Sequence, residues 1–140
     1  MFYDKYICEV LDGIKNALVT LQDGKIVTVQ EGIDKWSLQA KIIRDEKRGL
    51  IFFCGNGASA TMAEHMSHDW FQNAEINTTT CAETAHITAI SNDLSYDDVF
   101  SYRIRRILSE RDILVTISSS GNSPNMKKAL EAGKEKGAYC

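Results

Sequence analysis

The most informative segment of the chain is LIFFCGNGAS, residues 50–59. Its first five residues are apolar, without the alternation of a strand that faces water on one side. They therefore predict a strand that is buried on both faces inside a parallel sheet. The apolar run stops at Gly55, Asn56 and Gly57, and a helix is predicted to follow over residues 58–71. A buried strand that ends in glycines before a helix is typical of the strand–helix units of α/β folds.

The strand–helix order repeats along the rest of the chain. TAHITAIS, residues 84–91, and ILVTIS, residues 113–118, are predicted as the second and third main strands. Ser95 with Asp98 three residues later has the pattern of a capping box, which opens a helix. This order predicts an α/β fold with a three-layer, doubly wound parallel sheet and helices on both faces.

The last predicted helix has signals at both ends. Ser123 is a good N-cap, and Pro124 suits the first helical position because the N–H that proline lacks would have no partner there. The helix is expected to run to Lys136, with Gly137 as its C-cap. Residues 138–140 then look like the start of another strand. We therefore expect the fold to continue beyond them, and this chain to lack its C-terminal part.

Helical segments are also expected before the first main strand. Apolar residues recur with helical spacing over residues 2–22 and again over residues 33–48. Between them, residues 25–29 alternate like a short strand. The expected organisation is a single domain, residues 1–140, made of a helical N-terminal extension, residues 1–32, and an α/β core, residues 33–140.

Composition narrows the class of protein. Of the 140 residues, 44% are hydrophobic and 25% are charged, which suits one globular domain. The net charge of −3 provides no attraction to nucleic acid or to anionic membranes, and no apolar run approaches the roughly 18 residues of a membrane span. The N-terminus is unlike a secretory signal, and the four cysteines have no CxxC spacing. We expect a cytoplasmic protein with reduced thiols.

Small polar residues follow all three predicted strands, and open parallel sheets bind ligands beyond the carboxyl ends of their strands. The third cluster, SSSGNSPN, combines hydroxyls, a glycine turn and a helix N-terminus, which suits a phosphate. It lacks the GxxxxGK[ST] pattern of a nucleotide P-loop, and a serine turn with an N-cap is the alternative reading. The candidate ligand-binding residues are Asn56, Gly57, Ala58 and Ser59 after the first strand, Asn92 and Asp93 after the second, and Ser118, Ser119, Ser120 and Ser123 after the third.

His65 and Asp69 are four residues apart on a predicted helix and therefore share one of its faces. Either side chain can bind a metal, and Asp69 can act as a base, whereas the alternative is a solvent-facing pair. Two donors are fewer than the three or four that a zinc site needs. His86 is expected to pack within its strand, and the Asn92–Asp93 pair could also form a plain turn.

Three segments together resemble the sugar isomerase (SIS) family, most closely its bacterial phosphoheptose isomerase branch, which acts on sedoheptulose 7-phosphate. They are FCGNGASA, residues 53–60; HITAISNDLSYDDVFS, residues 86–101; and DILVTISSSGNSPNMKKALEAGKEKG, residues 112–137. They occur in the same order as in the family, and the resemblance covers about residues 33–137.

The resemblance implies a fold and an activity. The implied fold is the SIS fold, which is flavodoxin-like or Rossmann-like. The implied reaction is aldose–ketose isomerisation of a heptose 7-phosphate through an enediol, in a cytoplasmic homotetramer that serves the synthesis of heptose for lipopolysaccharide or capsule. A related branch of the family implies the alternative of a non-catalytic protein, which binds a phosphosugar or a replication-initiator partner.

The resemblance also implies roles for single residues. His65 would be a zinc ligand, and Asp69 stands where the family has a glutamate that acts as base and metal ligand. The remaining ligands of the family are a glutamine and a histidine that also serves as acid, and both lie in a later segment. Ala58 stands where the family has a glycine. The implied substrate contacts are Asn56, Gly57, Ala58, Ser59, Asn92 and Asp93, and the implied phosphate contacts are Ser118, Ser119, Ser120 and Ser123.

Overall fold

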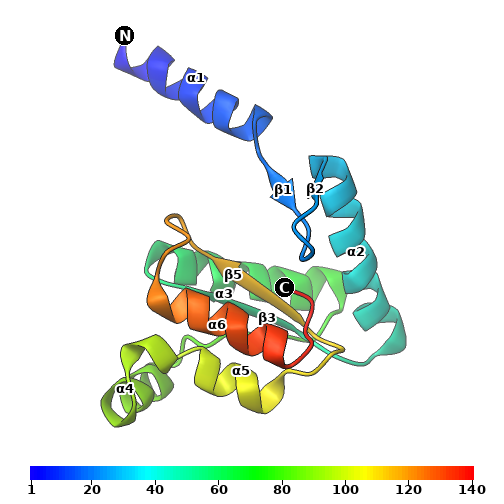
Figure 1. The fold of residues 1–140 in the computed structure, drawn as a ribbon, viewed down its shortest axis with the longest axis vertical. Helices are drawn as coiled ribbons and strands as arrows, with labels where there is room; N and C mark the ends of the chain where they lie inside the picture. Colours follow the sequence, from blue (N-terminus) through cyan, green and yellow to red (C-terminus); the bar gives the residue numbers. More distant parts are fainter. The chain divides into compact units, whose positions relative to one another are not determined.

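The computed structural model describes residues 1–140, which divide into two compact units, Met1–Leu38 and Gln39–Cys140. The first unit contains helix α1, Phe2–Lys15, and an antiparallel hairpin of β1, Val19–Thr20, with β2, Ile26–Val27 (Figure 1). Strand β2 confirms the short strand predicted there. Helix α2, Val29–Glu46, begins in the first unit, and its second half belongs to the second unit.

The prediction of one helix over residues 2–22 is wrong after Lys15, where α1 ends. A turn folds the chain back instead, and the N–H of Leu21 donates to the carbonyl of Lys25 at an N···O distance of 2.8 Å. Gly24 in this turn has φ +86°, which a glycine adopts without strain. The β-branched residues of β1 fit an extended pair well, so hairpin pairing outweighs the helical spacing of the segment.

The second unit is built on a parallel sheet of three strands in the order β4-β3-β5, which confirms the predicted α/β fold. Figure 1 shows β3 and β5 of this sheet with the helices around them. None of the helices combines the length and the apolar character that crossing a membrane requires. The strands are β3, Ile51–Gly55, β4, Thr78–Thr79, and β5, Ile113–Ile117; the helices are α3, Ala58–Ala74, α4, Thr84–Asp93, the short 3-10 helix η1, Tyr96–Asp98, α5, Ser101–Ile107, and α6, Pro124–Glu135.

The strand predicted over residues 84–91 is wrong, because this segment is helix α4. Ile87 and Ile90 are three residues apart and both pack against the core, which is the spacing of a helix face. Thr88 donates its hydroxyl hydrogen to the carbonyl of Thr84, 2.8 Å away, as threonines in helices do. The neighbour of β3 in the sheet is β4, a strand of only two threonines that carries little sequence signal.

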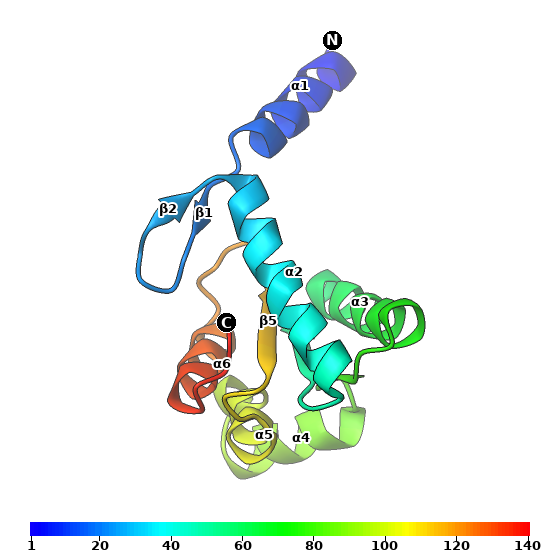
Figure 2. The same ribbon diagram turned by 90° about the vertical axis from the view of Figure 1, so that its right-hand side faces the viewer.

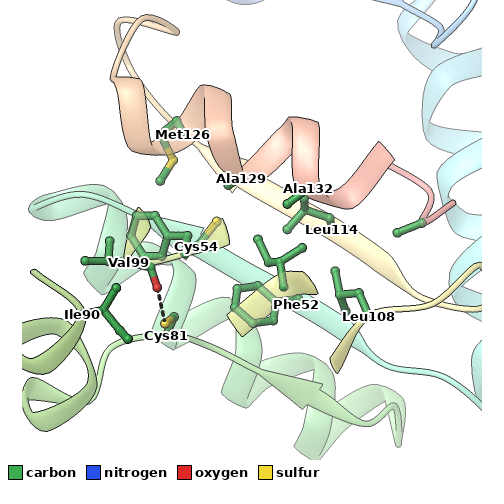
Figure 3. Packing of buried hydrophobic residues seen from close by; sticks show 13 residues of the cluster. Phe52, Cys54, Cys81, Ile90, Val99, Leu108, Leu114, Met126, Ala129 and Ala132 are labelled. Carbon is green, nitrogen blue, oxygen red and sulfur yellow. Dashed lines mark hydrogen bonds between the residues drawn. The ribbon is translucent and has the colours of Figure 1, made fainter. Parts of the chain in front are cut away.

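Helices cover both faces of the sheet, as a doubly wound fold requires. Phe52 and Cys54 of β3 pack on one face in a cluster with residues of α4, α5 and α6 (Figure 3). Ile51 and Phe53 pack on the other face with residues of α3 and of the second half of α2. Figure 2 shows α3 and α6 on opposite sides of β5. Because β3 is buried along its whole length, its continuous apolar run is explained.

The end of the chain follows its predicted course. Helix α6 begins at Pro124 after Ser123 and ends at Glu135, one residue before its predicted end. Tyr139 then forms a parallel bridge with Ile113 of β5, which confirms that the last residues begin to pair as a strand.

The segment before α5 differs from its prediction. Ser95 donates its hydroxyl hydrogen to the Asp98 carboxylate, with 2.6 Å between Oγ and Oδ2. This side-chain bond replaces the predicted capping box, in which the side chains would bond to backbone N–H groups. The bond spans the single turn of η1, from its N-cap Ser95 to its last residue Asp98, and α5 begins only at Ser101.

Candidate functional site

The chain passes from β3 to α3 through a turn that needs glycine at two positions. A Cβ at Gly55 would lie 2.5 Å from the carbonyl oxygen of Ser59, inside contact distance. Gly57 has φ +56°, a backbone conformation that side chains disfavour. Ser59 N–H donates to the carbonyl of Asn56 at 3.0 Å, which closes the turn. The glycines therefore let α3 begin directly beyond the end of the strand.

The glycine turn and the serine loop leave the sheet side by side. Gly55 of β3 is in register with Ile117 of β5, so Asn56 and Ser118 follow at the same edge. In the sheet, β4 pairs with one edge of β3 and β5 pairs with the other edge. The chain therefore runs from β3 to its neighbour on one edge and then crosses over to form the neighbour on the opposite edge. The position between β3 and β5 is thus a topological switch point, where doubly wound folds bind their ligands.

Two asparagines join these segments. Asn56 Nδ2 donates to Asn125 Oδ1, and Asn125 Nδ2 donates to Asn56 Oδ1, both at 2.9 Å. The hydroxyl of Tyr96 donates to the same Asn56 oxygen at 3.1 Å. An amide nitrogen carries two hydrogens, so Asn56 keeps one N–H for a further acceptor. The pair holds the start of α6 against the glycine turn and leaves one donor of Asn56 available.

The serine loop, residues 118–123, keeps its hydroxyl hydrogens available. Ser118 Oγ accepts the N–H of Gly121 at 3.1 Å, and Ser120 Oγ accepts the N–H of Asn122 at 3.2 Å. A hydroxyl that accepts a hydrogen bond can still donate one. Ser123 occupies the N-cap position of α6, and its side chain makes no capping bond to the helix. Hydroxyl donors and a helix N-terminus therefore meet in one loop. This combination of donors suits an anion.

A cavity of about 260 Å³ adjoins the glycine turn. Its buried wall includes Cys81, Val99 and Phe100, and its exposed lining includes Glu64 of α3 and Tyr96 of η1. Burial raises the pKa of the Cys81 thiol to about 11, so this thiol stays protonated at neutral pH. The cavity therefore combines an apolar wall with a carboxylate and a phenol hydroxyl.

His65 and Asp69 lie together on an exposed part of α3. His65 Nε2 is 3.4 Å from Asp69 Oδ2, and the two side chains are 73% and 43% exposed. No group of three or more histidines, cysteines or acidic residues in the chain is arranged to hold a metal ion. The pair alone does not fit a catalytic zinc, which normally has three protein ligands. Asp69 instead lines a shallow hollow with Trp70 and other residues of α3.

The remaining predicted residues are placed as follows. Ala58 and Ser59 form the first turn of α3, next to Asn56 and Gly57. Asn92 and Asp93 end α4, are exposed, and bond to each other, with Asn92 Nδ2 donating to Asp93 Oδ1 at 2.9 Å. They do not line the cavity beside the glycine turn.

His86 is in α4, where its Nε2 is 2.9 Å from the carbonyl oxygen of Val99. It is half-buried, so the packed role expected for it is confirmed, although in a helix instead of a strand.

Sequence reasoning missed three residues of this region: Glu64, Tyr96 and Asn125. Asn125 lies in SSSGNSPN, and its position in the first turn of α6 was the available signal. Glu64 is four residues after Ala60, so both share the cavity-lining side of α3. Tyr96 had no such signal, because its place depends on η1 folding over the end of β3.

Comparison with known protein families identifies one domain. A sequence model of the SIS domain matches residues 16–140. The chain is 38% identical over 93 residues to a phosphoheptose isomerase of Nitratidesulfovibrio vulgaris, covering 62% of this chain and 45% of that protein. It is 31% identical over 136 residues to a phosphoheptose isomerase of Histophilus somni, covering 91% of this chain and 70% of that protein. The chain spans about half the length of several curated relatives that it matches.

Solved structures share this fold. Phosphoheptose isomerase GmhA from Neisseria gonorrhoeae superposes with a TM-score of 0.72 at 28% identity, over 99% of this chain and 72% of that chain. A phosphoheptose isomerase from Francisella tularensis gives a TM-score of 0.62 at 24% identity, over 80% and 73% of the two chains. The second comparison concerns the fold alone.

Proposed function

The chain belongs to the SIS domain family, and from this premise we propose that it is a phosphosugar isomerase of the phosphoheptose isomerase type. In this proposal the substrate of the chain is a heptose 7-phosphate such as sedoheptulose 7-phosphate. The reaction is an aldose–ketose isomerisation that passes through an enediol. The observation that carries the proposal is the register of β3 and β5, which puts the glycine turn and the serine loop at one edge of the sheet.

In this proposal the phosphate binds to the serine loop. Ser118, Ser119, Ser120 and Ser123 donate hydrogen bonds to its oxygens, and the N-terminus of α6 adds a favourable dipole. The free N–H of Asn56 contacts the sugar. Asn92 and Asp93 lie outside the cavity lining, so they belong to the proposal only as contacts at the rim of the site.

The phosphate assignment is tested by calorimetric titration with sedoheptulose 7-phosphate. A hydrogen bond to a charged group contributes about 1.5–3 kcal/mol, so Ser120→Ala is expected to weaken binding by about tenfold or more. Ser37→Ala in α2, a half-buried serine outside this region, serves as the matched control and is expected to bind like the unchanged chain. Unchanged affinity in both Ser120→Ala and Ser123→Ala would rule out this placement.

The proposed base, which removes the proton beside the carbonyl, is the carboxylate of Asp69. Asp69 lies on α3 outside the cavity beside the glycine turn, so the assignment rests on the family resemblance and not on the lining of that cavity. We also propose that His65 and Asp69 bind a zinc ion. Because a catalytic zinc normally has three protein ligands, this proposal requires at least one further ligand from outside the pair. His65→Ala is expected to reduce zinc binding, measured as zinc retained after dialysis.

A second candidate function is phosphosugar binding without turnover, in a protein that regulates or recruits a partner such as a replication initiator. The exposure of the His65–Asp69 pair favours it. A turnover assay with sedoheptulose 7-phosphate separates the candidates, since a binding protein retains affinity and forms no product. Pull-down of an initiator protein would further support the second candidate.

We also propose a cytoplasmic homo-oligomer, with a tetramer favoured, that acts in heptose synthesis for lipopolysaccharide or capsule. Helix α1 supports self-association because none of its residues is buried. Its large apolar side chains, among them Val10, Leu11 and Ile14, are 41%, 48% and 67% exposed. A second copy of the chain would cover them.

A further inference from the structure

The cavity beside the glycine turn carries chemistry that the proposed phosphate site does not use. Glu64, Tyr96 and Asn56 line it from three different elements, α3, η1 and the turn after β3. None of the ion pairs of the chain involves Glu64, so its carboxylate oxygens are available as acceptors. Residues this far apart in sequence meet here only because of the fold.

The polar atoms of this cavity match the hydroxyl groups of a sugar chain. A carboxylate only accepts hydrogen bonds, and an alcohol hydroxyl can donate to it. The Tyr96 hydroxyl donates its hydrogen to Asn56 Oδ1, which leaves its oxygen to accept a further bond. Asn56 offers its second N–H as a donor to an alcohol oxygen. Two acceptors and one donor at the edge of an apolar wall suit a ligand with several alternating hydroxyls.

The size and position of the cavity agree with this chemistry. A water molecule occupies about 30 Å³ in the liquid. A cavity of about 260 Å³ therefore accommodates several hydroxyl-bearing carbons. Asn56 links the cavity to the serine loop, because its amide is bonded to Asn125 at the start of α6. A ligand with its phosphate on the loop can reach the cavity by passing over Asn56.

We propose that Glu64 and Tyr96, with Asn56, form a subsite for the hydroxyl-bearing carbons of the phosphosugar. The inference rests on the proposed phosphosugar binding and adds the residues that select for a polyhydroxylated chain. Glu64 accepts one or two sugar hydroxyls, Tyr96 accepts another, and the Asn125 amide fixes the orientation of Asn56. These residues bind substrate, and the proton transfer is left to other groups.

The test compares two probes, sedoheptulose 7-phosphate and inorganic phosphate, by calorimetric titration of the whole chain. Glu64→Gln is expected to lower the affinity for the phosphosugar by about tenfold, because one charged accepting oxygen is replaced by an NH2 group that cannot accept a hydroxyl hydrogen. Tyr96→Phe is expected to lower it by about threefold to tenfold. The affinity for inorganic phosphate is expected to stay within about twofold in both variants, whereas Ser120→Ala lowers the affinity for both probes.

Matched controls separate binding from folding. Glu110→Gln and Tyr3→Phe change exposed residues that do not line the cavity, and both are expected to bind like the unchanged chain. Melting curves of all variants establish that each is folded at the temperature of the titration.

Each result decides between the two proposals. If the unchanged chain binds the phosphosugar and both Glu64→Gln and Tyr96→Phe bind it equally well, the subsite is refuted and the phosphate site stands. Equal losses for phosphosugar and phosphate would also refute the subsite, because the residues would then act on the loop. If the unchanged chain binds no phosphosugar, both proposals fail together.

Discussion

Asn125 is a polar side chain with only 1% of its surface exposed, in the first turn of α6. Its amide satisfies that of Asn56 through two hydrogen bonds. At the scale of single residues, this pair connects the serine loop to the glycine turn. Burial of the Asn125 amide is tolerated because the partly buried Asn56 supplies both a donor and an acceptor to it.

We expect Asn125→Ala to destabilise the fold. Asn56 is partly buried and would lose two hydrogen bonds, each of which contributes about 0.5–1.5 kcal/mol to the free energy of unfolding. The measurement is urea denaturation followed by circular dichroism. Asn73→Ala, an exposed asparagine of α3, is the control and is expected to change stability by less than about 0.5 kcal/mol. Similar midpoints for both variants would show that the amide pair contributes nothing.

At the scale of elements, the first turn of α3 depends on backbone geometry that side chains disfavour. Gly57 has φ +56° and ψ −126° at the N-cap of this helix, and a Cβ on this residue would lie in open space. The cost of a substitution there is therefore conformational and not a collision. Gly55, by contrast, is restricted by the close approach of Ser59.

Gly57→Ala is expected to lower the free energy of unfolding by about 1–3 kcal/mol, since alanine at this φ and ψ is strained. Thermal unfolding measures the loss. Gly13→Ala is the matched control: Gly13 lies within α1 and also has open space around its Cβ position, but alanine there favours the helix by about 1 kcal/mol. The explanation is wrong if Gly57→Ala is as stable as the unchanged protein.

Helix η1 is tied to α6 by a charged contact. Lys128 Nζ is 2.9 and 3.0 Å from the two oxygens of Asp98. The hydroxyl of Ser95, followed by the ammonium of Lys128, holds the pKa of Asp98 below its ordinary value of 3.8. This contact positions the turn that carries Tyr96 into the candidate site.

A lowered pKa makes this contact sensitive to acid. The ionised Asp98 contributes stability that is complete above its ordinary pKa of 3.8 and is lost as the pH falls through its lower folded-state pKa. Asp98→Asn is therefore expected to lower the Tm at pH 7, and the difference from the unchanged protein should shrink at about pH 3 and below. Asp97→Asn, next to it in sequence, is the control. A constant difference across this pH range would contradict the assignment.

At the scale of the whole molecule, α1 carries an apolar face with no buried residue. An isolated helix of 14 residues is marginally stable in water, so this face needs a partner to be maintained. The proposed partner is a second copy of the chain. In this proposal α1 stays helical only in the oligomer, so the monomer would not form a stable α1 before it associates.

Sedimentation at micromolar concentration is expected to give a mass above the 15.7 kDa of one chain. Val10→Asp combined with Leu11→Asp places two charges on the apolar face and is expected to reduce the mass toward that of the monomer. Glu9→Gln, a polar change on the same helix, should leave the mass unchanged. A monomer mass for the unchanged chain would remove the basis of the oligomer proposal.

The class of fold and two of its three parallel strands could be predicted without the structure. The apolar runs at residues 50–54 and 113–117 could be recognised as strands, because a strand buried on both faces must be apolar at nearly every position. The glycine turn and the serine loop could also be recognised in the sequence. Their positive φ angles favour glycine, and the start of a helix favours serine and proline.

Tertiary packing settled the remaining elements and contacts. Residues 84–91 have apolar positions that suit a strand or a helix, and packing of Ile87 and Ile90 against the core selects the helix. The contact between Tyr96 and Asn56 joins residues 40 apart in the chain, and that between Asn56 and Asn125 joins residues 69 apart. Local propensity carries no information about such pairs, because they form only when the sheet and its helices bring distant segments together.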